Sequence, residues 1–113
     1  SYPLLVGKDA SKNINALLAL VNEIGSYQSE VLYYEWVGER RWDIHMKSEL
    51  VFKLPENNLN KGLNVMRMFL RETNKLSKTV VSVDLRNIDK PIIRFRKAPP
   101  VEYLGKNIRR LAG

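Results

Sequence analysis

The sequence holds few residues of the types that carry out catalysis. His45 is the only histidine and there is no cysteine, which excludes thiolate zinc sites, cysteine nucleophiles and disulfides from this sequence. His45 lies between Ile44 and Met46 on the polar side of an expected strand, a pattern typical of a surface histidine. Asp84 and Asp89 flank an expected turn, where hydrogen bonding to the backbone accounts for both residues. No metal-ligand spacing, Gly-rich phosphate loop or nucleophile elbow occurs, so we expect a non-enzyme without cofactor, metal or small-molecule substrate.

The chemistry that remains is that of main-chain and charged groups in residues 80–97, VVSVDLRNIDKPIIRFRK. Val81, Val83 and Leu85 alternate with polar residues, which predicts a strand with one buried face. The next four residues, Asn-Ile-Asp-Lys, have turn chemistry, because Asn and Asp side chains bond their own backbone and tolerate left-handed dihedral angles.

A second strand follows this turn and begins at Pro91. Proline donates nothing to a strand ladder, so it belongs at the start of a strand or on a sheet edge. A final strand that begins with proline and carries arginines is typical of an open edge, which is where we place the function. One face of this strand carries Ile93 and Phe95, and the other carries Ile92, Arg94 and Arg96.

The elements upstream are predicted from hydrophobic periodicity and turn residues. Asp9 or Ser11 is expected to cap the first helix, whose left-handed C-cap is Gly25, and Asn57 or Asn58 is expected to cap the second. The expected order is a strand at 2–7, a helix ending at Gly25, strands at 30–37, 42–46 and 50–54, a helix from 57 or 58 to about 76, and the pair of strands described above.

Hairpin-length connections make antiparallel neighbours, so this order predicts an α+β fold in which two helices pack on one antiparallel sheet with an open edge at the final strand. Residues 1–97 are expected to form the domain. Residues 98–113 form a basic tail that is either mobile or a short docking helix. The expected core contains Leu17, Leu18, Trp42, Ile44, Leu50, Phe52, Leu63, Met66, Val81, Val83 and Leu85.

Charge is distributed unevenly along the chain. The net charge is +7, with 6 Lys/Arg against 8 Asp/Glu in residues 1–56 and 13 against 4 in residues 57–113. A basic half fits nucleic acid, an anionic membrane or an acidic protein, and equally a solvated face that keeps the domain soluble. The longest apolar run, residues 16–21, is too short to span a bilayer.

An alternative function, a basic α+β nucleic-acid-binding domain, is suggested by aromatic residues interleaved with arginine, which can stack on bases. Against this alternative, the RNP1-type pattern of sheet-based RNA readers is absent. Trp42 also alternates in phase with Ile44 and Met46, which places it in the core. The residues concerned are Tyr33, Tyr34, Trp36, Arg40, Arg41 and Trp42.

Three segments in order carry a family resemblance. They are Pro3-Leu4-Leu5-Val6-Gly7 before a helix, Val37-Gly38-Glu39-Arg40-Arg41-Trp42-Asp43-Ile44, and Val81-Ser82-Val83-Asp84-Leu85-Arg86 ahead of a final strand. Together they resemble the C-terminal β domain of the bacterial cell-division protein family FtsQ (DivIB in some bacteria), in its alphaproteobacterial form. The match covers about residues 3–97.

The resemblance implies a non-catalytic role. Family members are single-pass inner-membrane proteins with a transmembrane helix, a POTRA domain and then this domain in the periplasm, so the resemblance implies a periplasmic location and no membrane contact except through a missing N-terminal helix. In the family, the domain recruits the FtsB–FtsL pair, and a segment of FtsB pairs with the final strand by β-augmentation. No nucleic-acid partner is implied.

The resemblance also points to particular residues. Arg86 matches the arginine that closes the family's Val-Asp-Leu-Arg motif, and Phe95 falls where many relatives place a large aromatic. We expect Phe95 to be the apolar anchor for a partner, unless it turns inward with Ile93 as part of the core. Arg40 or Arg41 matches a family arginine that pairs with an FtsB carboxylate. Pro91 departs from the family pattern, since it removes one donor from the edge, and this leaves open which backbone groups a partner uses. The expected partner-binding residues are Arg40, Arg41, Arg86, Pro91, Ile92, Ile93, Arg94, Phe95 and Arg96.

Overall fold

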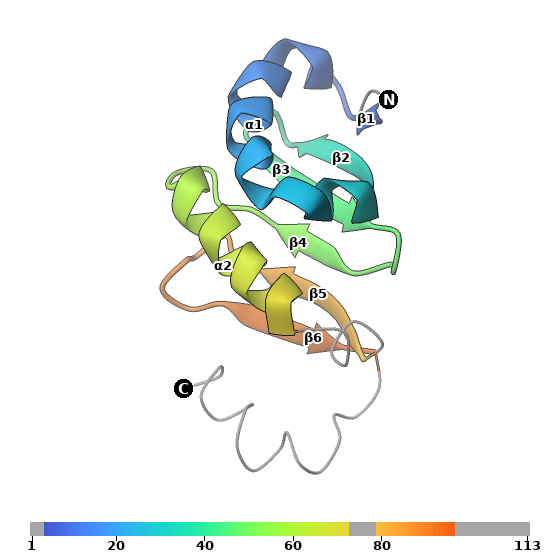
Figure 1. Ribbon diagram of the computed structural model, residues 1–113. Helices are drawn as coiled ribbons and strands as arrows, with labels where there is room; N and C mark the ends of the chain where they lie inside the picture. Colours follow the sequence, from blue (N-terminus) through green and yellow to red (C-terminus); the bar gives the residue numbers. More distant parts are fainter. Residues whose placement is uncertain (1–3, 73–78, 97–113) are drawn as a thin grey trace.

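The computed structural model describes residues 4–72 and 79–96 (Figure 1). The expected tail at 98–113, and the end of the second helix beyond Glu72, therefore lie outside the described residues. The elements, where η denotes a 3-10 helix, are β1 (Leu5–Val6), η1 (Ala10–Asn13), α1 (Ile14–Val21), η2 (Asn22–Glu30), β2 (Val31–Val37), β3 (Arg41–Met46), β4 (Val51–Lys53), α2 (Leu59–Glu72), β5 (Val80–Asp84) and β6 (Ile92–Phe95).

The six strands form one open sheet in chain order, from β1 to β6. The expected α+β class is confirmed, but the sheet is mixed where we expected it to be antiparallel throughout. β1 and β2 are parallel, and so are β4 and β5. Each of these pairs is joined by a connection that carries an α-helix. Such a connection returns the chain to its starting end, whereas the short connections give antiparallel pairs.

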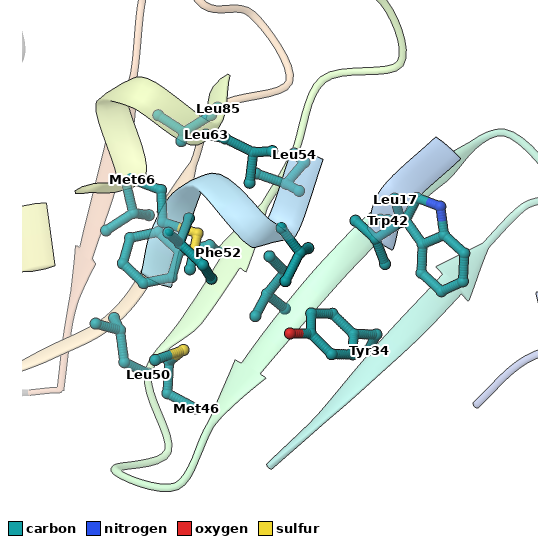
Figure 2. Close-up of a cluster of buried hydrophobic side chains, with 14 of the residues drawn as sticks. Leu17, Tyr34, Trp42, Met46, Leu50, Phe52, Leu54, Leu63, Met66 and Leu85 are labelled. Atoms are coloured by element: carbon teal, nitrogen blue, oxygen red, sulfur yellow. The ribbon is translucent and has the colours of Figure 1, made fainter. Parts of the chain in front are cut away.

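Both α-helices lie over the same face of the sheet (Figure 1). Trp42, Ile44 and Met46 on β3 are all buried, as their alternation predicts. The cluster in Figure 2 runs from Tyr34 and Trp42 to Leu63 and Met66, so a single core lies between the sheet and the two helices. Burial raises the pKa of Tyr34 to about 12.

Two of the expected core residues are only partly buried. Leu18 lies about 100° around α1 from the fully buried Leu17, at the margin of the buried stripe. Val81 lies at a register shift between β5 and β6, where Val80 is the buried residue instead. An extra residue at such a shift interrupts the strict alternation of faces that we assumed. The other nine expected core residues are buried.

The first helical region is broken where glycine allows it. Gly25 has a positive φ of 58, but its ψ of −125 is not that of the left-handed helical region, so the expected left-handed C-cap is wrong. α1 ends at Val21, and short 3-10 turns continue past Gly25 to Glu30. Asp9 precedes η1 with φ 62 and makes no side-chain capping bond, so the expected cap at Asp9 is wrong. Ser11, the other expected cap, lies inside η1. Instead, the Asn13 side chain donates to the Asp9 carbonyl at 2.9 Å.

The second helix begins directly after Asn58, whose carbonyl accepts a hydrogen bond from the Gly62 N–H at 3.0 Å. Gly62 is buried, and a Cβ atom there would lie 2.5 Å from Pro55 Cδ. A residue without a side chain is therefore needed where α2 crosses the segment that leaves β4. Within the described part of the chain, no helix has the length and apolar character to cross a membrane.

Candidate partner-binding edge

β6 is the last strand of the sheet and has β5 as its only neighbouring strand within residues 4–72 and 79–96. The pair is antiparallel, with Ser82 opposite Arg94 and Asp84 opposite Ile92. The turn that joins the two strands is confirmed: Lys90 N–H donates to the Asn87 carbonyl at 3.0 Å, and Asn87 Oδ1 accepts from the backbone of Asp89 at 3.2 Å. β6 is therefore an edge strand, positioned by a tight hairpin.

The register determines which backbone groups of β6 face outward. Arg96 N–H donates to the Thr79 carbonyl at 2.7 Å, toward β5. Because backbone groups alternate in direction along a strand, the N–H and C=O groups of Ile93 and Phe95 point away from β5. Pro91 shares their direction, so its missing N–H falls on the outward side. The side of the strand that faces away from β5 thus offers N–H donors at Ile93 and Phe95 and carbonyl acceptors at Pro91, Ile93 and Phe95.

The two side-chain faces of β6 differ in exposure. Ile93 and Phe95 are partly buried and pack against the core, so Phe95 lies on the core side with Ile93. Ile92 is 62% exposed and Arg94 is also exposed. A strand added at this edge would find a half-buried aromatic on one face and an apolar side chain beside arginine on the other.

Arg86 is held by Asp84 just beyond the end of β5. Its Nε lies 2.9 and 3.0 Å from the two carboxylate oxygens, and its Nη2 lies 2.5 Å from Oδ2. This ion pair holds the pKa of Asp84 below its usual range, since the Arg86 guanidinium and backbone N–H both donate to the charged carboxylate. As we expected, hydrogen bonding to the backbone of the turn region occupies Asp84.

Arg96 reaches across to the loop between β3 and β4. Its Nη1 donates to Glu49 Oε2 at 3.1 Å, and both side chains are well exposed. An exposed pair of this kind contributes between about 0 and 1 kcal/mol to stability, so a carboxylate of another protein could displace Glu49 at little cost.

Arg40 and Arg41 do not lie with the other expected partner-binding residues. Arg41 begins β3, and Arg40 precedes it in the hairpin turn. Three strand spacings, about 14 Å, separate β3 from β6 in the sheet. Arg41 is largely buried and donates to Asp43 at 3.4 Å, whereas Arg40 is exposed. A single strand paired along β6 would not touch both regions through its main chain.

The aromatic residues behind the nucleic-acid alternative are engaged inside the domain. Tyr34 and Trp42 are each 3% exposed, and the rings of Trp36 and Trp42 pack at a centroid distance of 5.0 Å. Tyr33 stacks on His45 at 4.1 Å. The described part of the sheet thus offers no ordered row of free aromatic rings for bases to stack on.

A cluster that we did not expect lies on the sheet face opposite the helices. Glu35, Asp43 and His45 bring one possible ligand atom each to within 4.8 Å of one another. A search for metal-ligand spacing along the sequence missed this cluster. Glu35 belongs to β2, and only the pairing of β2 with β3 brings it close to Asp43 and His45. The available signal was the three-residue turn, which places Glu35 opposite Asp43.

The fold and the edge define the class of the protein: a small α+β domain with an open mixed sheet that ends in a charged edge strand. The family model described as cell division protein FtsQ/DivIB, C-terminal, matches residues 1–86. The chain belongs to this family. The family match ends at Arg86, before β6 begins.

Curated relatives agree with this assignment. The chain is 35% identical over 95 residues to "Cell division protein FtsQ" of Rhizobium radiobacter, which is 84% of this chain and 45% of the relative. It is 32% identical to the protein of that name from Bradyrhizobium diazoefficiens, over 84% of this chain and 28% of the relative. The Zymomonas mobilis protein is 30% identical, over 92% and 33%. The chain spans less than half the length of these relatives.

Proposed function

We propose that this domain is a non-catalytic periplasmic interaction module of the division machinery, and that it binds an FtsB-like partner, together with an FtsL-like one, by adding a strand at β6. Family membership supports the division role. The observation that carries the binding mode is the edge itself, where the backbone groups of Ile93 and Phe95 face away from β5.

The charges around this edge favour an acidic partner. Arg94 is exposed on β6, Arg96 follows it, and Arg86 lies at the end of the neighbouring strand. Like charges on an edge strand oppose pairing with a second copy of the same strand, while carboxylates on a different chain are attracted. Arg86 serves a partner only if the partner's carboxylate shares it with Asp84, because the guanidinium is already bound twice.

The periplasmic location rests on the family resemblance and on the length of the relatives. Since the chain covers 28–45% of the relatives described above, there is room in such proteins for an anchor and a further domain. Sequencing the gene upstream of Ser1 tests this part: a transmembrane segment and a POTRA-sized region support it, and a cytoplasmic fusion partner contradicts it.

The binding mode is tested by changing one outward backbone group. Ile93→Pro removes an N–H that points away from β5, so pairing with β5 is retained while the donor to an incoming strand is lost. Ile93→Ala is the matched control, because it shortens the same side chain and keeps the N–H. Both variants are checked by circular dichroism and titrated with the periplasmic FtsB–FtsL complex.

We expect Ile93→Pro to bind roughly tenfold more weakly than Ile93→Ala, as lost main-chain hydrogen bonds are worth about 0.5–1.5 kcal/mol each. Equal affinity of the two folded variants would show that β6 is not used by main-chain pairing. A folded chain lacking residues 91–97 that still binds would remove this edge from the interaction altogether.

A further inference from the structure

The helix-free face of the sheet carries a group of polar side chains on β2 and β3. Residues two apart on a strand share a face, which places Asp43 and His45 together on β3. Glu35 lies directly opposite Asp43 on β2, and Tyr33 lies opposite His45. Two adjacent antiparallel strands therefore deliver two carboxylates and one imidazole to the same place.

The three possible ligands are close and partly enclosed. His45 Nε2 lies 2.8 Å from Glu35 Oε1. The exposed fractions of the side chains are 21% for His45, 36% for Glu35 and 8% for Asp43. Solvent thus reaches the group from one side, while the strands behind it hold the Cα positions fixed. Sites built on strands keep their geometry better than sites on loops.

The imidazole ring of His45 is already held in place in the ion-free domain. The Tyr33 ring stacks on His45 with a centroid distance of 4.1 Å and an interplanar angle of 17°. Asp43 is less firmly engaged, since the Arg41 Nε contact at 3.4 Å exceeds the roughly 2.7–2.9 Å of a well-formed charge-assisted bond. His45 is therefore held in a fixed orientation, whereas Asp43 accepts only a long hydrogen bond from Arg41 and can turn toward an ion.

We propose that Glu35, Asp43 and His45 form a binding site for a divalent cation of borderline softness, with Zn²⁺ as the representative ion. One imidazole and two carboxylates are donors that zinc accepts, and water completes a tetrahedron when the protein supplies three ligands. Tetrahedral zinc holds its ligand atoms roughly 3.4 Å apart, so modest rotation of the carboxylates closes the observed group, whose atoms lie within 4.8 Å. Mg²⁺ and Ca²⁺ prefer six or more oxygen ligands and fit this donor set poorly.

Arg41 is the internal competitor for this ion. Its guanidinium neutralises Asp43 in the ion-free domain, and the cation must displace it. Removing Arg41 should then tighten ion binding. If the three residues form only a structural network of hydrogen bonds and ion pairs, the same change has no such effect. Arg41→Gln thus separates the two interpretations.

The composition of the chain makes a metal-binding test unambiguous. His45 is the only histidine and there is no cysteine, so imidazole ligation in an untagged chain must come from His45. Zn²⁺ is titrated by calorimetry, and Co²⁺ is used as a coloured substitute whose visible absorption reports tetrahedral nitrogen and oxygen ligation. We expect one ion per chain, no binding after His45→Ala, and tighter binding after Arg41→Gln.

The carboxylate variants add a graded readout. Glu35→Gln and Asp43→Asn should each weaken Zn²⁺ binding at least about tenfold, because even residues that only orient a metal ligand cost that much. Glu39→Gln, which removes an exposed carboxylate in the adjacent turn, is the control and should leave the affinity unchanged. If Asp43→Asn does not fold, Glu35→Gln and His45→Ala still decide the question.

Three results would overturn the proposal: no Zn²⁺ binding up to about 1 mM, an affinity far weaker than specific sites show; binding that survives His45→Ala; or one ion shared by two chains. None of these results bears on pairing at β6, and failure of the β6 experiment does not affect this site.

Discussion

Asp84 and Arg86 form an ion pair at the point where β5 turns toward the candidate edge. The lowered pKa of Asp84 means that the folded state favours its charged form. The pair's contribution to stability is therefore fully present above the unfolded pKa of aspartate, near 3.9, and is lost as pH falls through the folded pKa.

We expect Arg86→Gln to lower the free energy of unfolding at pH 7 by about 0.5 kcal/mol, in the range of solvent-exposed pairs. The difference from the wild type should shrink as pH falls through the lowered pKa of Asp84 in the folded state, because the protonated carboxyl no longer pairs with Arg86. Urea unfolding at a series of pH values measures this. The pKa of Asp43 is raised mainly by burial, and this carboxyl titrates in both proteins. Its charge also interacts with the Arg86 guanidinium, so the difference includes a smaller contribution from Asp43. Arg71→Gln, a change of an exposed arginine on α2, is the control; an equal and pH-independent loss in both variants would contradict the role of the pair.

Phe95 and Ile92 lie on opposite faces of β6 and distinguish two ways of anchoring a partner. Phe95→Ala should weaken binding of the FtsB–FtsL complex roughly thirtyfold, since a buried aromatic anchor is worth about 2 kcal/mol or more. Because Phe95 also packs on the core, its truncation should cost folding stability, roughly 2 kcal/mol for a half-buried ring. Binding is therefore titrated where circular dichroism shows both variants folded.

Ile92→Ala is the companion variant, because Ile92 is 62% exposed and its loss should barely affect folding. Unchanged affinity in Phe95→Ala removes this ring as the anchor. A larger loss in Ile92→Ala than in Phe95→Ala would show that the partner's apolar contact lies on the helix-free face of the sheet.

At the scale of elements, Gly62 gives a test in which packing opposes helix propensity. Alanine is favoured over glycine inside a helix by about 1 kcal/mol. Here its Cβ would lie 2.5 Å from Pro55 Cδ and 2.9 Å from Pro55 Cγ, closer than atoms pack, so α2 or the segment after β4 must move. We expect Gly62→Ala to destabilise the domain, by roughly 1–3 kcal/mol as for other overpacked sites. Thermal unfolding measures this, and Lys61→Ala at an exposed position of α2 is the control. A stabilised Gly62→Ala would mean that the contact with Pro55 relaxes at little cost.

The elements that are predictable from the sequence are those fixed by local chemistry. Periodicity identified both α-helices and the strands from β3 onward, while β1 and β2 were predicted from apolar and aromatic content. The three-residue turn at 38–40 correctly separates β2 from β3. The parallel pairing of β4 with β5 was not predictable in this way, because it depends on where a helical connection returns to the sheet. The half-burial of Val81 was missed for a related reason, since a register shift is a property of two strands together.

The candidate site likewise has features that local sequence predicts and features that depend on strand pairing. Pro91 and the arginines of the last strand predicted an edge, and β6 is the last strand of the sheet formed by the described residues. Which backbone groups face outward follows only from the register against β5. The cluster of Glu35, Asp43 and His45 likewise depends on pairing across the hairpin. The partners of the edge and its role in binding stay predictions.

At the scale of the whole molecule, the chain carries a net charge of +7. If the edge binds a protein, raising salt should weaken FtsB–FtsL binding only shallowly, because few ion pairs form. Phosphate binding would give a steep slope of log affinity against log salt, near −0.7 per phosphate contacted on single strands. We expect no specific binding of single-stranded oligonucleotides at physiological salt; a steep slope with submicromolar affinity would support the nucleic-acid alternative.

The strand order also has a consequence for how the domain assembles in time. β2, β3 and β4 are joined by short hairpins and can form from local contacts, whereas β5 must wait until the long connection through α2 has closed. β6 has β5 as its neighbour in the described sheet, so it cannot be held in place before that closure. We therefore expect the candidate edge to form last in folding, which pulse-labelled hydrogen exchange would detect as late protection of β5 and β6 amides. A partner that binds at β6 would therefore bind only domains that have completed folding, and incompletely folded chains would not be recruited.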